Sequence, residues 1–543
     1  MLACTLSNMP RVRTAITIGF MVAIALLQAG IRPPGVESGV WLRDHIATGR
    51  LEDLRWPGFA HDRTALLQFY ESNGFNPAWL RRKQPTFQAL SLIASLRAAG
   101  TKGLDPEDYD GSRWTARLNE IRGDTDIETL SRFDLALTIA SFRFVSDLDS
   151  GRANPRIFHL DSDVRAGGKR AKWIRDNLQY ARQTADAIPA ALQSLEPPFP
   201  AYRETEGALA RYRSLAAEGQ PETFPARKLP VKPGDPYSAA PRLYAFLHRL
   251  GDAPGTGAAP DDYSDALVSA VTHFQERHGL QPDGILGPAT VRALNVPLAQ
   301  RVKQIELTLE RWRWLPRQFD HPPVIVNIPH FELAAFDRDN RVAVRMKVIV
   351  GGAYGHRTPV FSARMNAVIF HPWWDVPPNI ARKELQPKAD KDPGYLARNH
   401  YVVVVSPDGR TRIRQRPGED NALGAIKFTF PNRFDVYMHG TPATELFLQS
   451  RRDFSHGCIR VEDPERLAQW ALDDTPGWSP ERIRAAIQDP KTVQVMLSRQ
   501  IPVLIVYGTA IAGEDGLTRF FDDIYGYDAQ LIRTLAAGRS EWM

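Results

Sequence analysis

Two short strings in the last quarter of the chain contain the residues best suited to chemistry. They are YMHGT at 437–441 and SHGCIRV at 455–461. A cysteine thiol at its ordinary pKa is only a few per cent thiolate at neutral pH, so a neighbouring imidazole that takes its proton is the simplest activation. The strings supply both groups, with Cys458 as the nucleophile and His439 or His456 as its base.

The spacing gives each histidine a different route to the thiol. His456 precedes Cys458 by two residues, and positions i and i+2 of an extended strand share a face. His439 comes from a separate strand and can meet the sulfur across a sheet. Gly457 has no side chain, so a substrate carbonyl can approach the backbone there. Both histidines are therefore candidates for the base.

Cysteine usage bears on the role of that thiol. The sequence contains only Cys4 and Cys458. Two arginines precede an uncharged stretch, 14–31, and prolines follow it, which is typical of an export signal or a membrane anchor. Residues 1–35 are predicted to be a signal-anchor in the inner membrane, with a cleaved signal as the alternative, and the remainder to be periplasmic. An unpaired exported Cys458 is either buried and inert or retained for its chemistry.

Composition limits the partners and the number of domains. A chain of 543 residues with 43% apolar content exceeds what one hydrophobic core usually organises, so two or three domains are expected. Lys and Arg total 68 against 62 Asp and Glu, and no basic run concentrates the net charge of +6. Nucleic acid is therefore not an expected partner. The weak positive charge suits solubility or a polymer that bears carboxylates.

Helical elements are expected to come first in the chain. Apolar residues at three and four spacing predict a helical scaffold domain over 62–219. Prolines between 220 and 236 indicate a linker that resists packing. A small three-helix domain is predicted over 231–297, with one helix at 265–278 and another opened by the Gly-Pro pair at 287–288.

Strand-like segments are expected after Arg301, where the pattern changes from helical to extended. A β-sandwich or barrel-like catalytic domain is predicted over 322–510. Its strands are predicted at 324–328, 333–336, 342–350, 367–370, 401–405, 411–415, 426–430 and 436–439. Residues 375–399 form a long insertion that predicts a lid, with a disordered insertion as the alternative, and 511–543 form a C-terminal tail. The fold class is therefore multidomain α+β.

The small helical domain resembles a known module. The string AVTHFQERHGLQPDGILGPATVRALN at 270–295 is similar to the peptidoglycan-binding domain of many cell-wall enzymes. Three-helix packing explains the apolar positions equally well, whereas the FQ, GL, DG and GP elements at this spacing favour the family. The resemblance implies peptidoglycan as a partner.

The two strings described first also resemble a family signature. HG(T) followed by SHGC(I)R(V) is similar to the catalytic domain of L,D-transpeptidases of the YkuD type. The resemblance implies that Cys458 is the nucleophile, that His439 is the general base, and that the Gly440 carbonyl orients the imidazole. It also implies that His456 shapes the pocket, and that the backbone N–H groups of Gly457 and Cys458 face the oxyanion.

Most of the chain resembles the long, multidomain subgroup of these enzymes, in which the insertion caps the substrate cleft. The substrate-binding positions that the resemblance implies are Trp374, Tyr437, Thr441, Ser455 and Arg460. Trp374 can equally pack in a core, and Arg460 can pair with a substrate carboxylate or with a structural acid such as Glu462. One departure is His371, where the subgroup pattern leads us to expect Asn.

The implied substrate is the peptidoglycan stem peptide. Cys458 would attack a tetrapeptide stem at its third residue, release D-Ala, and pass the acyl group to an amine of a second stem as a 3→3 crosslink. No metal or organic cofactor is implied, and carbapenems are expected to acylate the thiol. The same acyl-enzyme also permits L,D-carboxypeptidase activity or attachment of a protein to peptidoglycan.

Two readings from other functional classes remain. His439, His456 and Cys458 are legitimate zinc ligands, although no HExxH string completes a metallopeptidase site. A non-catalytic wall-anchoring protein would need only the membrane segment and the binding domain.

Overall fold

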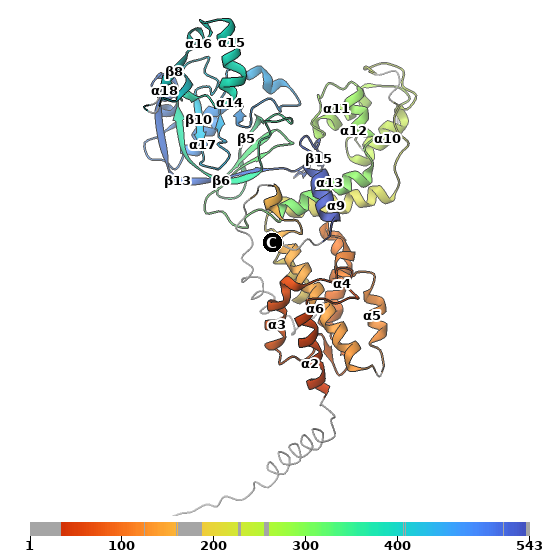
Figure 1. Ribbon diagram of the computed structural model, residues 1–543. Coiled ribbons are helices and arrows are strands. Elements are labelled where there is room, and N and C mark those ends of the chain that lie inside the picture. Colours follow the sequence, from red (N-terminus) through yellow and green to blue (C-terminus); the bar gives the residue numbers. More distant parts are fainter. Residues whose placement is uncertain are drawn as a thin grey trace, which may run out of the picture. The chain divides into compact units, whose positions relative to one another are not determined.

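Helices dominate the first part of the chain and strands the last (Figure 1). The computed structural model describes residues 34–123, 125–158, 160, 187–225, 230–254, 260–405, 407, 409–513 and 515–538. The chain divides into two compact units, one built mainly from residues up to Arg152 with a segment that ends at Glu196, and one built mainly from Pro197–Ala536.

The predicted signal-anchor, 1–35, lies outside the described residues except for its last two positions. Within the part of the chain that the structure describes, no helix is long and apolar enough to cross a membrane.

The first unit is helical, as predicted from its 3.6-residue periodicity. Its helices are α2 (Pro34–Thr48), α3 (Arg63–Glu71), α4 (Phe87–Arg97), α5 (Trp114–Glu120), α6 (Ile127–Ser150) and α8 (Ala187–Gln193), with a two-stranded ribbon of β1 (Leu80–Arg81) and β2 (Gln84–Pro85). Helix α6 is buried on most of its circumference and runs through the core. Its Asp134 is fully buried and accepts hydrogen bonds from the Tyr70 hydroxyl at 2.8 Å and the Trp79 backbone N–H at 2.7 Å.

The second unit begins with helices. They are α9 (Pro200–Ala217), α10 (Ala240–Leu250), α11 (Asp265–Arg277), α12 (Pro288–Leu294) and α13 (Leu298–Trp312). The two helices predicted in the small domain, α11 and α12, are present, with Gly279 in the left-handed region after the first and Gly287 capping the second. Helix α9, at the end of the predicted helical scaffold, packs in one core with α10 to α13.

The expected change from helix to strand after Arg301 is wrong, because α13 continues to Trp312. Arginines alternate with aromatic residues in the string ERWRW, 310–314. This alternation resembles the two-residue period of a β-strand. Both arginines of the string are buried, and Arg311 forms an ion pair with Asp528. The sequence pattern misleads because buried, paired arginines occupy positions of a helix that usually hold apolar residues.

The expectation of a linker that resists packing over 220–236 is also wrong in part. The Phe224 side chain is buried in the α9 to α13 core. Its backbone N–H donates to Asn295 Oδ1 at 2.7 Å, and its carbonyl accepts from Asn295 Nδ2 at 2.9 Å. Val231 forms a β-bridge with Leu286. The Asn295 side chain therefore holds the proline-rich segment against the helical core.

A closed eight-stranded barrel follows, which confirms the strand-rich prediction. Its strands are β3 (Val324–Asn327), β4 (Glu332–Phe336), β5 (Val342–Ile349), β6 (Phe361–Phe370), β10 (Ile426–Thr429), β11 (Met438–His439), β12 (Ile459–Val461) and β13 (Val493–Val506), in the order β10-β11-β12-β5-β4-β3-β13-β6. Helices α17 (Pro464–Leu472) and α18 (Pro480–Gln488) pack on the barrel core. Strand β13 was missed, because a bulge between Met496 and Ile501 and a proline at 502 break its pattern.

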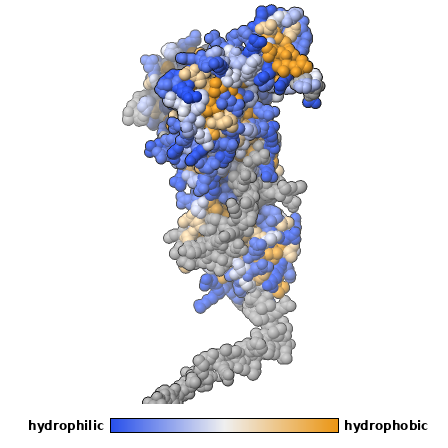
Figure 2. Space-filling model, turned by 90° about the vertical axis from the view of Figure 1, so that its left-hand side faces the viewer, coloured by the Kyte–Doolittle hydropathy of each residue, from blue (hydrophilic) through white to orange (hydrophobic). Residues whose placement is uncertain are grey.

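The insertion is larger than the predicted 375–399 and has structure of its own. It comprises β7 (Trp374–Asp375), α14 (Pro378–Ile380), a π-helical turn (Ala381–Leu385), α15 (Gln386–Lys391), α16 (Tyr395–Arg398), β8 (Tyr401–Val405) and β9 (Thr411–Gln415). The sheet order is β7-β9-β8, so two strands predicted for the catalytic core belong to the insertion instead. Val403 and Val405 of β8 are exposed, and Figure 2 shows a hydrophobic patch at the upper end of that view.

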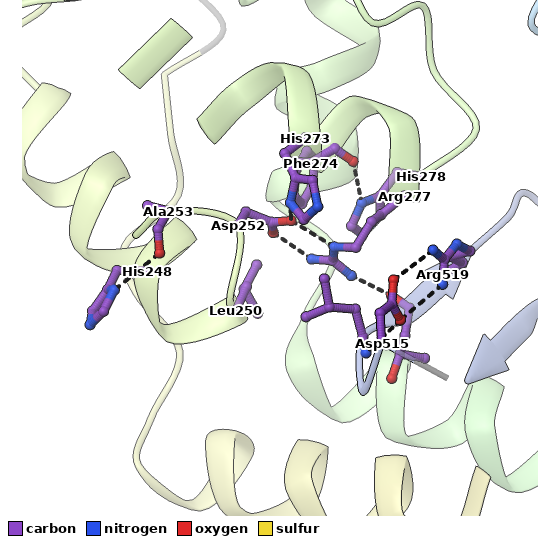
Figure 3. Close-up of polar contacts among 12 residues, drawn as sticks. His248, Leu250, Asp252, Ala253, His273, Phe274, Arg277, His278, Asp515 and Arg519 are labelled. Carbon is purple, nitrogen blue, oxygen red and sulfur yellow. Dashed lines mark hydrogen bonds and ion pairs between the residues drawn. The ribbon is translucent and has the colours of Figure 1, made fainter. Parts of the chain in front are cut away.

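The C-terminal residues fold onto the second unit. Strands β14 (Ala510–Ala512) and β15 (Thr518–Phe520) form a hairpin, and α19 (Tyr527–Ala536) follows. Figure 3 shows the polar contacts between this hairpin and the small helical domain, in which Arg277 of α11 binds the Asp252 carboxylate and the Thr518 carbonyl. Asp252 also accepts from His273 at 2.9 Å. The segment predicted as a tail therefore joins the small domain to the barrel.

Candidate active site

The barrel register brings the two motif strings together. Strands β11 and β12 are parallel neighbours, with His439 opposite Arg460. Cys458 directly precedes β12, and the next N–H, that of Ile459, donates to the Tyr437 carbonyl at 3.0 Å. On the other side of β11, His439 stands opposite Lys427 of β10. Lys427, His439 and Arg460 therefore form a row across three strands, because residues directly opposite in a register share a face.

A bend, and not an extended strand, leads into Cys458. Gly457 has a φ of +118°, a conformation that favours glycine, so the expected face-sharing of His456 and Cys458 does not apply. The Ser455 hydroxyl accepts from the Gly457 N–H at 3.2 Å and donates to the Cys458 carbonyl. The Thr358 hydroxyl donates to the Gly457 carbonyl at 2.8 Å. Two hydroxyl groups thus hold the backbone of Gly457 and Cys458.

Cys458 is a free thiol that lies half-buried at the end of this loop. Its Sγ lies 3.9 Å from the Asp435 carbonyl oxygen. Burial raises the pKa of the thiol, and hydrogen bonding by Tyr437 and the charges of Lys427 and Arg460 oppose that rise. The surroundings therefore favour the thiol at rest and supply cations for the thiolate.

His439 is buried and neutral. Burial, followed by the charge of Arg460, lowers its pKa to about 3. Its Nδ1 lies 2.6 Å from the Gly440 carbonyl oxygen. Because a carbonyl only accepts, Nδ1 must hold the proton, which leaves the lone pair on Nε2. The imidazole is therefore fixed in the tautomer of a base.

Lys427 was missed by the sequence analysis. Its Nζ lies 3.8 Å from the centroid of the Tyr437 ring, a cation–π distance, and burial lowers its pKa. Cys458 and Asp375 are the charges that act on it in the opposite direction. Within the string IKFTF, 426–430, the lysine looks like an ordinary solvent-facing position of a strand. Only the register with β11 reveals it.

The Tyr437 phenol contacts both the Cys458 thiol and the Trp374 indole. Burial, then the charge of Cys458, raises the pKa of the Tyr437 phenol, and a hydrogen bond with the Trp374 indole opposes that shift. Trp374 also packs against the small core of the insertion, with its ring 6.3 Å from that of Tyr401. The core role and the cleft role predicted for Trp374 are therefore both structurally possible, because one ring contacts both surroundings.

Arg460 is half-buried, and burial lowers its pKa. Among the residues that the structure describes, it has no carboxylate partner. Glu462, the structural acid considered above, instead accepts from the Lys347 backbone N–H at 3.0 Å and lies 3.9 Å from its Nζ. The guanidinium therefore retains its capacity to bind an anion.

The remaining predicted positions are less central. Ser455 is buried with its hydroxyl engaged inside the loop, and Thr441 accepts from the Ala443 N–H at 3.2 Å. His456 faces the insertion, where its Nε2 lies 2.6 Å from Glu384 Oε1. His371 has a φ of +46°, which explains why Asn is the expected residue there, and its Nε2 bonds the Ile487 carbonyl oxygen at 2.8 Å.

The zinc-site alternative requires a ligand cluster. The described ranges contain no group of three or more His, Cys, Asp and Glu side chains that could hold a metal ion.

Known proteins match three parts of the chain. Family models match at residues 64–209 (described as a scaffold domain), 242–294 ("Putative peptidoglycan binding domain") and 322–483 (YkuD, the L,D-transpeptidase catalytic domain). A curated Haemophilus influenzae protein, "Putative L,D-transpeptidase", is 33% identical over 245 residues, which is 42% of this chain and 49% of the relative. The chain thus spans about half the length of the curated relative that it matches.

Two solved L,D-transpeptidase structures also align with the chain. The one from Xylanimonas cellulosilytica is 17% identical, with a TM-score of 0.18, and covers 52% of this chain and all of its own. The one from Stackebrandtia nassauensis is 15% identical, with a TM-score of 0.23, over 51% of this chain and 94% of its own. Scores this low add nothing to the family matches. On those matches, the chain contains a YkuD-type L,D-transpeptidase catalytic domain, together with a scaffold domain and a peptidoglycan-binding domain.

Proposed function

We propose that the protein is an L,D-transpeptidase that forms 3→3 crosslinks between peptidoglycan stem peptides through a thioester on Cys458. The observation that carries this proposal is the state of His439. A neutral imidazole, with Nδ1–H bound to the Gly440 carbonyl oxygen, can accept a proton only at Nε2. Cys458 directly precedes the strand that pairs with that of His439, so in this proposal Nε2 receives the thiol proton.

In the proposed first step, His439 takes the thiol proton as Sγ attacks the carbonyl of the third stem residue. The proton then passes to the nitrogen of D-Ala, which leaves, and the thioester remains. The backbone N–H of Cys458 would be the main hydrogen-bond donor to the oxyanion, because the Gly457 N–H already donates to the Ser455 hydroxyl. Each good oxyanion donor contributes about 3 to 4 kcal/mol to the transition state.

Binding of the donor stem is proposed to use charge. Stem peptides carry carboxylates, and Arg460 is a half-buried guanidinium with its donors available. Lys427 adds a second cation beside Cys458. Tyr437 and Trp374 would form the apolar walls of the cleft, and the helical insertion would cover it.

The remaining parts of the proposal concern location. The peptidoglycan-binding domain would hold the enzyme on the wall polymer, so we propose that the protein acts in the periplasm. Anchoring in the inner membrane by residues 1–35 is part of the proposal and rests on the sequence pattern alone.

Other outcomes of the same thioester are L,D-carboxypeptidase activity and attachment of a protein to the wall. The structured insertion favours transfer to an amine, since a covered cleft excludes water while the thioester waits for its acceptor. A purely wall-anchoring protein has no use for an unpaired thiol and a neutral histidine in paired segments of the barrel.

The test is to incubate the full chain with disaccharide-tetrapeptide and to resolve the products by chromatography with mass detection. Crosslinked dimer and free D-Ala are expected, and neither should form with Cys458→Ala. Tripeptide without dimer would instead identify a carboxypeptidase. Muropeptides from cells with and without the intact gene would show whether the same crosslink forms in the wall.

A further inference from the structure

We propose that His456, held by Glu384, is the base that deprotonates the acceptor amine in the second half-reaction. This inference rests on the proposed transpeptidase function and assigns separate proton-transfer steps to the two histidines. His439 would serve acylation of Cys458, and His456 would prepare the amine that resolves the thioester.

The geometry of the pair supports a base. The His456 Nε2 lies 2.6 Å from Glu384 Oε1. A carboxylate only accepts, so Nε2 holds a proton and the lone pair stands on Nδ1. When Nδ1 takes a second proton, the carboxylate stabilises the imidazolium, which is how an acid orients a catalytic histidine in other acyl-transfer enzymes.

The two side chains are also accessible, unlike that of His439. They are 35% and 43% exposed, whereas His439 is 5% exposed. An acceptor stem must enter from solvent after the donor is bound, so its base has to lie on the open side of the cleft. The charged or titratable groups that face His456 are Glu384 from the insertion and His356, whose ring centroid is 4.5 Å away.

His456 lies near Cys458 along the backbone. It precedes Cys458 by two residues, and two residues span at most about 7 Å between Cα atoms. The proposed step requires the attacking amine to lie within reach of the imidazole, directly or through one water.

Glu384 comes from a distinct element. It lies in the π-helical turn Ala381–Leu385 of the insertion. Such turns are rare in proteins, and those that occur are often at functional sites. The base would therefore be complete only when the insertion stands over the loop of Cys458. Glu384 is a positioning residue in this account, because it acts through His456.

The chemical need for a second base is clear from the acceptor. An aliphatic amine with a pKa near 10.4 is unprotonated in roughly one molecule in a few thousand at pH 7. In the proposed step, an ammonium proton passes to His456 Nδ1, and the freed lone pair forms the C–N bond. The C–S bond breaks with its electron pair on Sγ. The second amine proton passes to His439 and then to the thiolate, and His456 releases its proton to solvent.

The experiment separates the two half-reactions in the full-length protein. Acylation is followed by intact mass after mixing with a tetrapeptide donor. Transfer is then followed with two nucleophiles, an aliphatic diamino-acid side-chain amine and hydroxylamine, which is largely unprotonated at pH 7. The variants are His456→Ala and Glu384→Gln, with Asp390→Asn on the same insertion as the matched control.

The expected result is that both variants acylate within about threefold of wild type but lose transfer to the aliphatic amine. The loss should be about 10²-fold for His456→Ala and smaller for Glu384→Gln. Transfer to hydroxylamine should stay near the wild-type rate, and Asp390→Asn should behave as wild type throughout. A defect in folding or in acylation would instead lower transfer to both nucleophiles.

Equal losses with both nucleophiles would overturn the inference and make His456 a residue that only shapes the pocket. A loss of acylation in His456→Ala as large as that of transfer would do the same. Failure of the wild-type protein to acquire an acyl group is a distinct outcome, since it removes the proposed function and the inference with it.

Discussion

The two sides of Cys458 are built on different principles. On the buried side, His439 and Lys427 belong to neighbouring barrel strands, and their positions follow from the register of the sheet. On the open side, His456 meets Glu384, which belongs to an insertion with its own small core. In the proposed mechanism, the barrel activates the nucleophile, whereas the acceptor side depends on an inserted element.

Removal of the base on the buried side should have the largest effect. His439→Ala should lower acylation of Cys458 by about 10² to 10⁴-fold, because it removes proton transfer from the thiol. The loss should be equal for every nucleophile, in contrast to His456→Ala. The measurement is the rate of adduct formation by intact mass. Equal acylation rates for the two histidine variants would erase the distinction between the sides.

Shortening the insertion should have the next largest effect, on the products and not on acylation. If residues 381–398 are replaced by a short Gly-Ser connection, Glu384 is lost and water reaches the thioester. Tripeptide release should then rise several-fold relative to dimer, while Cys458 still becomes acylated. Product ratios by chromatography give the answer. Circular dichroism and a thermal melt of the variant provide the control for folding, and an unchanged ratio in a folded variant would contradict the lid.

Neutralising Lys427 tests whether a cation from the barrel affects the pKa of the Cys458 thiol. Burial raises the pKa of Cys458 and the lysine opposes that rise, so Lys427→Met should raise the thiol pKa further. Thiolate then forms only at higher pH, and the midpoint of iodoacetamide alkylation against pH should move upward. Lys383→Met, on the insertion, is the matched control with no expected shift. A downward shift would contradict the account.

A change in the loop that joins the two sides should have the smallest effect. Gly457 has a φ of +118°, so Gly457→Ala forces strain of about 1 to 3 kcal/mol into the native state. The melting temperature should fall by a few degrees and the acylation rate should fall with it, because the Ser455 contacts that hold the loop are disturbed. An unchanged melting temperature would show that this backbone conformation is not needed.

The sequence predicted the two sides unequally well. Cys458, His439 and Gly440 could be predicted because they belong to a motif with fixed spacing, and the structure places them on or next to two paired barrel strands. Lys427 could not be found, because its role depends on which strand pairs with which, and that is settled only when the sheet closes. Glu384 was missed for a related reason, since nothing in the local pattern of the insertion relates it to His456.

The errors in the fold have a similar origin. Strands β8 and β9 were predicted correctly as strands but assigned to the wrong sheet, because alternation does not specify the pairing partner. The predicted end of helix α13 was too early, because buried arginines occupy positions on its buried face that usually hold apolar residues. Phe224 was assigned to a linker because the surrounding prolines indicated a segment that does not pack. Its side chain instead packs in the α9 to α13 core.

Every other assignment depends on Cys458 as the nucleophile. The most direct test is intact-mass analysis of the full-length protein incubated with a tetrapeptide donor and no acceptor, followed by peptide mapping. The predicted result is one acyl group from the tripeptide on Cys458, with stoichiometric release of D-Ala, and no adduct on Cys458→Ala. An acyl group on another residue, or D-Ala release that continues in Cys458→Ala, would contradict the account.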